Sequence, residues 1–304
     1  MELPASSTSA SEPAPSHNLL GRVSHWALIR ILVYIVAIAF VLLVTGIVSH
    51  KLIPQAPPTQ HHDLLILLNL LSASALVAIY FFVTRRLEHR APTELSLRSG
   101  YPLFLSGAAA GVALMALVYI VLWGLGRATF AAATGIDGLG GSLAVYFAAA
   151  ILEELVFRAV IFRIVEQMAG TTLAIIVSAS LFALLHSLNP GVTVMGIVSV
   201  ALAGGITFAL LYVLTRNLWL VIGVHFGWNF AEGSLFGAQV SGSGAAHSLL
   251  RTSLTGPELL TGGSFGPEGS IITITLYLLL AAALAFKIAG DGAWRGQRLK
   301  LSLE

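Results

Sequence analysis

Long apolar stretches, each close to the length of a bilayer-spanning helix, follow one another along most of this chain. A helix needs about 20 mainly apolar residues to cross a membrane, because lipid offers no hydrogen-bonding partners to unpaired backbone groups. A scan with that length predicts eight spanning helices, at residues 27–49, 63–84, 102–125, 142–166, 172–187, 193–215, 218–236 and 271–288. The fifth is short for a full span and is expected to be tilted, broken or partly re-entrant.

Composition agrees with this pattern and removes several function classes. Hydrophobic residues make up 57% of the chain and charged residues 10%, whereas a soluble domain carries about 25% charge. The chain has no cysteine, which excludes a disulfide scaffold, thiolate catalysis and any cysteine zinc site. A net charge of only +2, with scattered basic residues, leaves no footprint for nucleic-acid binding. The sequence therefore predicts an all-α, polytopic membrane protein.

The positions of Lys and Arg predict how the helices are oriented, since short loops rich in these residues stay cytoplasmic. With the N-terminus inside, the cytoplasmic side would hold most of them: Arg22, Arg85, Arg86, Arg90, Arg98, Arg163, Arg216, Lys287, Arg295, Arg298 and Lys300. The opposite side would hold only Lys51, Arg127 and Arg251. This asymmetry fits eight spans with both termini cytoplasmic.

The chain divides into five parts on these patterns. Residues 1–20 are rich in Ser, Pro and Ala and are predicted to form a disordered tail, and residues 21–141 to contain three transmembrane helices. Residues 142–236 carry the polar motifs of the core. Residues 237–270, rich in Gly and Ser and nearly chargeless, predict a mobile external loop, and 271–304 the last helix with a basic cytoplasmic tail.

Two glycines in the third predicted span have the spacing of a helix-packing motif. Gly107 and Gly111 form a small-xxx-small pattern, which lets two helix backbones approach closely. We therefore interpret this pair as a packing feature.

Three charged side chains, Glu153, Glu154 and Arg158, lie well inside the fourth predicted span, and each is costly in a bilayer unless compensated or functional. Glu154 and Arg158 are four residues apart on one helix face, where they can pair. Glu153 points about 100° away and is free to face a cavity. The alternative is that this helix ends near residue 152, so that the charged segment lies among the lipid headgroups.

Two further spans carry polar pairs one helical turn apart. The fifth contains Phe182 and His186, and the seventh contains His225 and Asn229. No His-Glu-x-x-His helix occurs, and a Gly-x-Ser-x-Gly pentad at Ser264 lacks the strand and helix that would give it meaning. The remaining chemistry is water activated by a carboxylate with help from histidine, together with polar donors for a developing oxyanion.

The combination of Glu153-Glu154-x-x-x-Arg158, Phe182-x-x-x-His186 and His225-x-x-x-Asn229 on successive helices resembles the CPBP family. That family groups type II CAAX prenyl endopeptidases with bacterial bacteriocin-processing and self-immunity proteins. The resemblance covers residues 142–236. It implies that Glu153 and His186 activate water, that His225 and Asn229 are oxyanion-side donors, and that Glu154, Arg158 and Phe182 support them.

The resemblance also implies an eight-helix core whose site opens toward the cytoplasm, and a membrane-anchored or lipidated peptide or protein as substrate. Glu153, His186 and His225 could hold zinc, but we favour catalysis without a metal, because asparagine is a good oxyanion donor and a poor zinc ligand. The composition is compatible with a bacterial plasma membrane. A non-enzymatic membrane protein is the competing hypothesis, either a self-immunity factor or a proton-coupled transporter using the same polar residues.

Several other polar residues receive structural interpretations. Arg163 and Glu166 are expected at the interfacial end of the fourth helix, with Arg163 snorkelling, and Glu232 is expected to form hydrogen bonds within the bundle. Trp228 is expected at the membrane interface. The two histidines of the Pro-rich external loop, His61 and His62, are expected to be solvated, with metal binding as the alternative.

Overall fold

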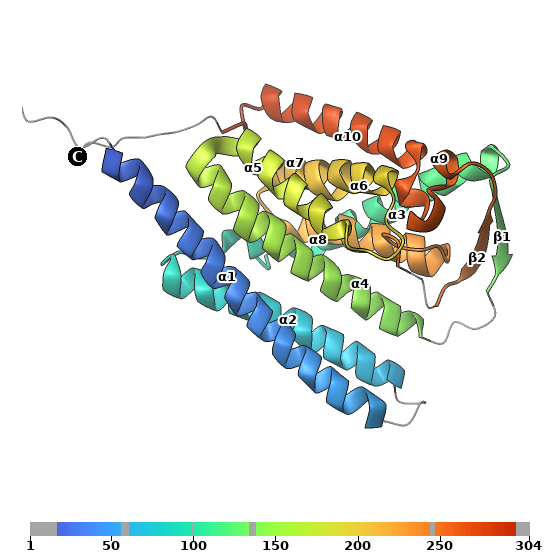
Figure 1. Ribbon diagram of the computed structural model, residues 1–304, viewed down its shortest axis with the longest axis horizontal. Coiled ribbons are helices and arrows are strands. Elements are labelled where there is room, and N and C mark those ends of the chain that lie inside the picture. The colour runs from blue at the N-terminus through green and yellow to red at the C-terminus, as the bar shows by residue number, and fades with distance from the viewer. Residues whose placement is uncertain (1–16, 56–60, 99, 134–137, 244–246, 296–304) are drawn as a thin grey trace, which may run out of the picture.

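A computed structural model describes residues 17–55, 61–98, 100–133, 138–243 and 247–295 of the protein, and these are mostly helical (Figure 1). The long helices are α1 (His17–Leu52), α2 (His61–Leu87), α3 (Gly100–Gly124), α4 (Leu139–Glu154), α5 (Arg163–His186) and α10 (Ile271–Gly290). The shorter ones are α6 (Val194–Val200), α7 (Phe208–Thr215), α8 (Leu218–Phe230) and α9 (Glu258–Thr261). Three π-helical segments connect or extend them, at Leu155–Phe162, Ala201–Thr207 and Ala231–Leu235. The described residues also contain two strands, β1 (Ala128–Ala132) and β2 (Leu250–Leu254), and short 3₁₀ segments at Ile53–Gln55, Thr93–Leu95, Gly263–Phe265 and Pro267–Gly269.

Among the described residues, six helices are long and apolar enough to cross a membrane: Trp26–Leu52, His61–Leu87, Gly100–Gly124, Leu139–His186, Val194–Thr215 and Ile271–Gly290. The predicted fourth and fifth spans both lie in the fourth of these, which is broken at Gly170 (φ 83°). The chain reverses at this break, where glycine adopts a backbone conformation that other residues avoid. The predicted seventh span is helical as α8 and its π-helical extension but is not among the six. An all-α polytopic membrane fold is thus confirmed, while eight crossings stay a prediction.

The first helix begins earlier than the apolar pattern indicated. α1 starts at His17, inside the range predicted to be a disordered tail. The rest of that predicted tail, and residues 296–304 of the predicted basic tail, lie outside the described residues.

Helices α3 and α8 approach each other through glycines on both partners. Gly107 and Gly111 lie against the backbone of α8, and Gly223 and Gly227 lie against the backbone of α3. A Cβ atom on Gly111 would collide with the backbone oxygen of Val224. The packing interpretation of the small-xxx-small pattern is therefore confirmed. This close contact fixes the position of α8, which carries two of the candidate site residues.

Gly111→Ala is expected to destabilise the protein by about 1–3 kcal/mol, because the added methyl group forces two backbones apart. The matched control is Gly46→Ala on α1, where a Cβ atom would meet nothing within 4 Å. That control is expected to leave the midpoint of thermal unfolding in detergent unchanged or slightly higher. Equal midpoints for the two variants would contradict close α3–α8 packing.

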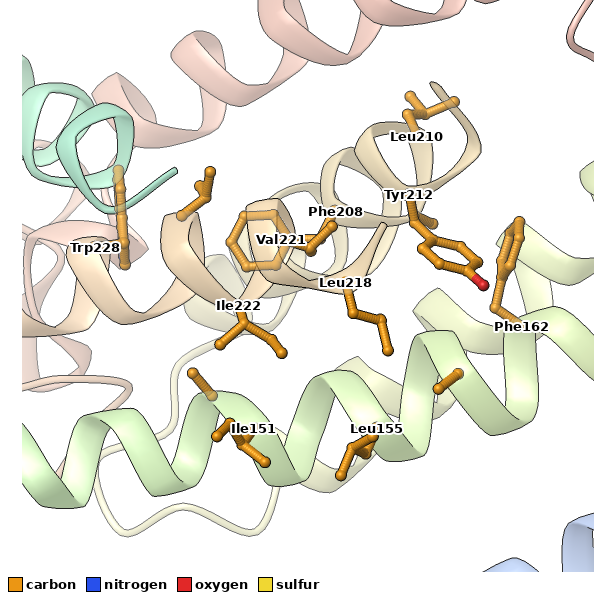
Figure 2. Packing of buried hydrophobic residues seen from close by; sticks show 14 of the residues in the cluster. Ile151, Leu155, Phe162, Phe208, Leu210, Tyr212, Leu218, Val221, Ile222 and Trp228 are labelled. Carbon is orange, nitrogen blue, oxygen red and sulfur yellow. The ribbon is translucent and has the colours of Figure 1, made fainter. Parts of the chain in front are cut away.

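The buried core lies between α4, with its π-helical continuation, and the pair α7 and α8 (Figure 2). Figure 2 shows Ile151 and Leu155 on one side of this layer and Leu218 and Ile222 on the other. α4 continues without interruption through Glu154 into the segment Leu155–Phe162. The alternative of a helix that ends near residue 152 among headgroups is therefore wrong.

The segment 237–270 is not the mobile external loop predicted from its Gly and Ser content. β2 within it pairs antiparallel with β1, with Leu254 opposite Ala128, a small sheet that the apolar pattern did not indicate. Phe265 is fully buried and packs with Phe157 and Phe182 of the bundle. The described part of this segment is thus folded against the helices, because an aromatic side chain in the middle of a polar stretch finds an apolar site there.

Arg163 and Glu166 are buried in ion pairs rather than exposed at an interface, so their predicted placement is wrong. The guanidinium of Arg163 donates to Glu88 at 2.8 and 2.9 Å, and its side chain is only 8% exposed. Glu166 pairs with Arg216 and accepts a hydrogen bond from Thr171 at 2.8 Å. These pairs join α5 to the end of α2 and to the end of α7.

Glu88 is the centre of the larger of these networks. It lies just beyond α2 and accepts hydrogen bonds from Arg30 of α1, from Arg90 and from Arg163. Burial alone raises the pKa of the Glu88 carboxyl, but the hydrogen bonds and charge of the three arginines outweigh burial and lower the pKa to about 2. The ionised carboxylate therefore stabilises the fold.

Because the pKa of Glu88 is lowered on folding, its contribution is present above the unfolded pKa, near 4.5, and is lost as pH falls toward 2. Glu88→Gln is expected to lower the unfolding midpoint strongly at pH 7, by the equivalent of about 3 kcal/mol or less, and much less at pH 3. The midpoints of parent and variant are measured across this range. The exposed Glu258→Gln is the control. A gap between parent and Glu88→Gln that does not narrow with acid would contradict the role of Glu88.

Candidate active site

Adjacent carboxylates at the end of α4 face two different environments. Glu154 is completely buried, and its Oε1 accepts a hydrogen bond from Arg158 at 3.0 Å. Arg158 is equally buried, donates to the backbone oxygen of Gly205, and lies over the ring of Phe182. The one-turn pair expected from the sequence is thus formed. Glu153 turns away from this pair and its side chain is 26% exposed.

Two histidines from two other helices converge on Glu153. Its Oε2 lies 3.9 Å from Nε2 of His186 on α5 and 3.7 Å from Nε2 of His225 on α8. These separations are too long for hydrogen bonds and suit proton transfer through one water. Oε2 is buried and has no hydrogen-bond partner among the described residues. The motifs that lie apart in sequence therefore meet at one carboxylate oxygen.

Nδ1 of each imidazole forms a hydrogen bond, and this bond determines whether Nε2 can accept or donate a proton. Nδ1 of His225 donates to Oε1 of Glu154 at 2.9 Å, and Nδ1 of His186 donates to the backbone oxygen of Phe182 at 2.9 Å. The ring of Phe182 also stacks on that of His186, 4.5 Å between centroids. Both rings consequently turn Nε2 toward Glu153. A neutral His186 then has a lone pair facing the site, whereas His225 donates from Nε2 only when protonated, a form that the Glu154 carboxylate stabilises.

A cavity of about 570 Å³ leads to these groups, and Glu153, His186 and Asn229 line it. A smaller chamber of about 30 Å³ lies beside it and is lined by His186, His225 and Asn229. Each of the four residues expected to be catalytic therefore lines one or both of these cavities, which share His186 and Asn229, and Phe182 lines the smaller one.

The mouth of the large cavity lies at the opposite end of the bundle from the buried arginine networks. His62 at the start of α2, Ser142 in the first turn of α4 and Asn189 beyond α5 line it. The sequence-based orientation places that end away from the cytoplasm. The cavity lining runs along α4 from Glu153 toward the start of that helix, away from the basic loops, whereas the resemblance implies an opening on the cytoplasmic side.

Glu268 borders the site although the sequence interpretation assigned it no role. Its Oε2 accepts a hydrogen bond from Trp228 at 3.2 Å, and it lines the small chamber beside His225. Its backbone N–H donates to Glu232 at 3.0 Å, so Glu232 forms the hydrogen bond expected of it, with the 237–270 segment as its partner. Trp228 is buried and not at the membrane interface as expected. The available signal was that Glu268 is one of only two carboxylates in the Gly-rich segment 237–270.

Other singled-out residues lie outside the chemistry. His62 lies at the cavity mouth, its ring 5.3 Å from that of His247, and is only half-exposed because α2 begins at His61. Ser264 is exposed, and its hydroxyl donates to the backbone oxygen of Gly191.

Zinc would require its ligands to converge more closely than these side chains do. Ligands at about 2.0–2.1 Å from a tetrahedral zinc lie about 3.3 Å from one another, whereas Glu153 is 3.7 and 3.9 Å from the two histidines. No group of three His, Asp or Glu side chains with metal-site spacing occurs in the part of the chain that the structure describes. The donor atoms are of the type that zinc binds, but this geometry is wider than a zinc site.

The fold and the site define a class of protein: a polytopic membrane protein in which three helices bring Glu, His, His and Asn to two neighbouring cavities within the bundle. Residues 135–231 match the family model described as type II CAAX prenyl endopeptidase Rce1-like, and this match supports the resemblance to the CPBP family. No curated protein and no solved structure matches the chain. The match covers all three motifs.

Proposed function

We propose that this protein is an intramembrane endopeptidase in which Glu153 and His186 activate water and His225 and Asn229 stabilise the developing oxyanion. The observation that carries the proposal is the convergence of Nε2 of both histidines on one buried oxygen of Glu153, 3.7 and 3.9 Å away, beside a cavity of about 570 Å³. The match to a protease family supports hydrolysis as the reaction.

The roles follow from the hydrogen bonds that hold each group. Unlike Glu154, which is paired with Arg158, Glu153 has no ion pair with an arginine or lysine among the described residues. Glu153 takes a proton from water as the water oxygen attacks the peptide carbonyl. Protonated His225 and the Asn229 amide donate to the carbonyl oxygen as it gains negative charge. Collapse of the tetrahedral intermediate breaks the C–N bond, and the proton held by the Glu153–His186 pair passes to the leaving amine. Glu154 and Arg158 are positioning residues because they act through His225.

Catalysis without a metal gives a separate prediction. Cleavage is expected to survive extensive dialysis against EDTA and 1,10-phenanthroline, because water is activated by side chains alone in this scheme. The purified protein is also expected to contain less than one zinc per chain by elemental analysis. Loss of cleavage on chelation with recovery on adding zinc would contradict metal-free catalysis and leave Glu153, His186 and His225 as ligands.

The proposed substrate is a membrane-anchored or lipidated polypeptide cut near a membrane-proximal segment, and the proposed location is a bacterial plasma membrane. The protein is an integral membrane protein that matches a protease family over residues 135–231, which supports a substrate attached to the same bilayer.

The function is tested by identifying new peptide ends in membranes of cells that express the parent chain or Glu153→Ala. Fragments found with the parent and missing with Glu153→Ala would support the proposal and would identify the substrate. Identical fragments would contradict it. A self-immunity factor that acts by binding would keep its protective effect after Glu153→Ala, which separates that alternative from proteolysis.

A further inference from the structure

One continuous face of α4 lines the large cavity from its mouth to the candidate catalytic carboxylate. The lining residues recur every three or four positions, as expected for one side of a helix: Gly138, Gly141, Ser142, Val145, Tyr146, Ala149, Glu153 and Phe157. Glu153 lies 11 residues from Ser142, so it is about 16 Å deeper along the helix axis. The cavity is therefore a channel that runs lengthwise through the bundle from the start of α4.

Elements from distant parts of the chain surround the mouth of this channel. Besides the first turn of α4, it is lined by the start of α2 at His62, by Asn189 beyond α5, and by Ser243 and His247 of the segment after α8. Figure 1 shows the start of α4 at the same end of the molecule as the end of α1 and the start of α2. Along α2, His62 and Arg86 are about 36 Å apart, close to the thickness of a membrane.

Basic side chains gather at the other end. Among the Lys and Arg residues whose side chains are described, nine lie at the end of the bundle away from the cavity mouth: Arg30, Arg85, Arg86, Arg90, Arg98, Arg163, Arg216, Lys287 and Arg295. Three lie near the mouth: Lys51, Arg127 and Arg251. Positive charge in short loops keeps them cytoplasmic. The charge distribution and the cavity thus point to opposite sides of the membrane.

The arginine end is also closed by packing. Between Glu153 and that end lie Arg158 and Phe162, both fully buried, followed by the Arg163–Glu88 ion pair. None of the residues of the Glu88 and Glu166 networks lines the cavity. No residue of these two networks lines the smaller chamber beside the site either.

From these placements we infer that the site is reached from the side of the membrane opposite the cytoplasm, and that its substrate is a polypeptide segment presented on that outer side. This rests on the proposed function for the reaction but not for the direction of access. Polar side chains at the mouth and apolar side chains along the walls, among them Leu65, Val145 and Leu185, suit an extended and largely uncharged segment. A prenylated chain end displayed in the cytoplasm would lie on the closed side.

The absence of native cysteine allows a direct test with single-cysteine variants. Ser243→Cys, exposed at the mouth, and Ser142→Cys, on the channel wall, report on the cavity, and the exposed Ser96→Cys, next to the Glu88 network, is the matched control. Each is treated with a membrane-impermeant maleimide in sealed right-side-out and inside-out vesicles from the same expressing bacterial cells. Ser243→Cys and Ser142→Cys are expected to react only in right-side-out vesicles, and Ser96→Cys only in inside-out vesicles.

The inference is overturned if the two cavity cysteines react only in inside-out vesicles, if they react equally in both, or if they react in neither while reacting after solubilisation in denaturant. This readout needs no proteolysis. If the cavity cysteines react from the outside but the parent and Glu153→Ala give the same peptide fragments, the proposed function is contradicted and the inference about access is not. If peptide fragments depend on Glu153 but the cavity cysteines react from the cytoplasmic side, the inference about access is contradicted and the proposed function is not.

Discussion

Glu153→Gln is expected to reduce the rate of peptide cleavage by about 10²–10⁴-fold while leaving the fold intact. The amide has the same shape as the carboxylate but cannot take a proton from water. Because Glu153 is partly exposed and no arginine or lysine is paired with it in the described residues, its replacement removes no buried ion pair. The thermal unfolding midpoint is therefore expected to stay close to that of the parent. Cleavage is measured in membranes as the rate at which the Glu153-dependent fragments appear.

The same change at an exposed position far from the cavity provides the control. Glu258→Gln lies on α9, outside the cavity lining, and is expected to cleave like the parent. His186→Ala and His225→Ala are expected to lose cleavage as Glu153→Gln does, because each removes a nitrogen that faces the same oxygen. Parental cleavage by Glu153→Gln would show that another group activates the water.

Arg158→Met is expected to destabilise the protein by about 3–5 kcal/mol, since removing one partner of a buried ion pair leaves the other charge uncompensated. Arg158 and Glu154 are both fully buried, and the Glu154 carboxylate would keep only His225 as a partner. Methionine preserves most of the side-chain length and the contacts with the rings of Phe182 and Phe208. The measurement is the unfolding midpoint in detergent, compared with the exposed Arg251→Met as a control.

A double variant separates stability from activity. In Glu154→Gln/Arg158→Met no charge is left unpaired, so much of the lost stability is expected to return. Cleavage is not expected to return, because a neutral amide in place of the Glu154 carboxylate would no longer stabilise the protonated form of His225 that donates to the oxyanion. A double variant as active as the parent would show that Glu154 and Arg158 do not act through His225. An Arg158→Met protein as stable as the parent would show that the buried pair does not stabilise the fold.

The site was predictable because the cost of charge in lipid makes its residues conspicuous. Glu153, Glu154 and Arg158 stand out in an apolar helix, and the one-turn spacing of Glu154 and Arg158 is enough to predict their ion pair. The order of the motifs along the chain then indicated that the helices with His186 and His225 contribute to the same site. The hydrogen bond between His225 and Glu154 was not predictable, since 71 residues separate them in the chain.

Segments with polar sequence were predicted less well. The stretch 237–270 looks like a surface loop by composition, yet it buries Phe265 and brings Glu268 beside His225. Arg163 and Glu166 look like interfacial residues because each is charged and near a predicted span end. Their partners, Glu88 and Arg216, come from other helices, and only long-range packing brings them together.

The sequence by itself determined that this is an all-α membrane protein and which polar residues lie within its helices, because the bilayer limits both the length and the charge of a span. Only the tertiary structure decided that Glu153 meets His186 and His225 at one oxygen and that the cavity opens at the start of α4. The hydropathy pattern specifies which residues of a helix lie within the membrane. It does not specify which helices are neighbours or which face each helix turns toward them. Those depend on contacts such as the glycine-to-backbone packing of α3 on α8, which no local pattern contains.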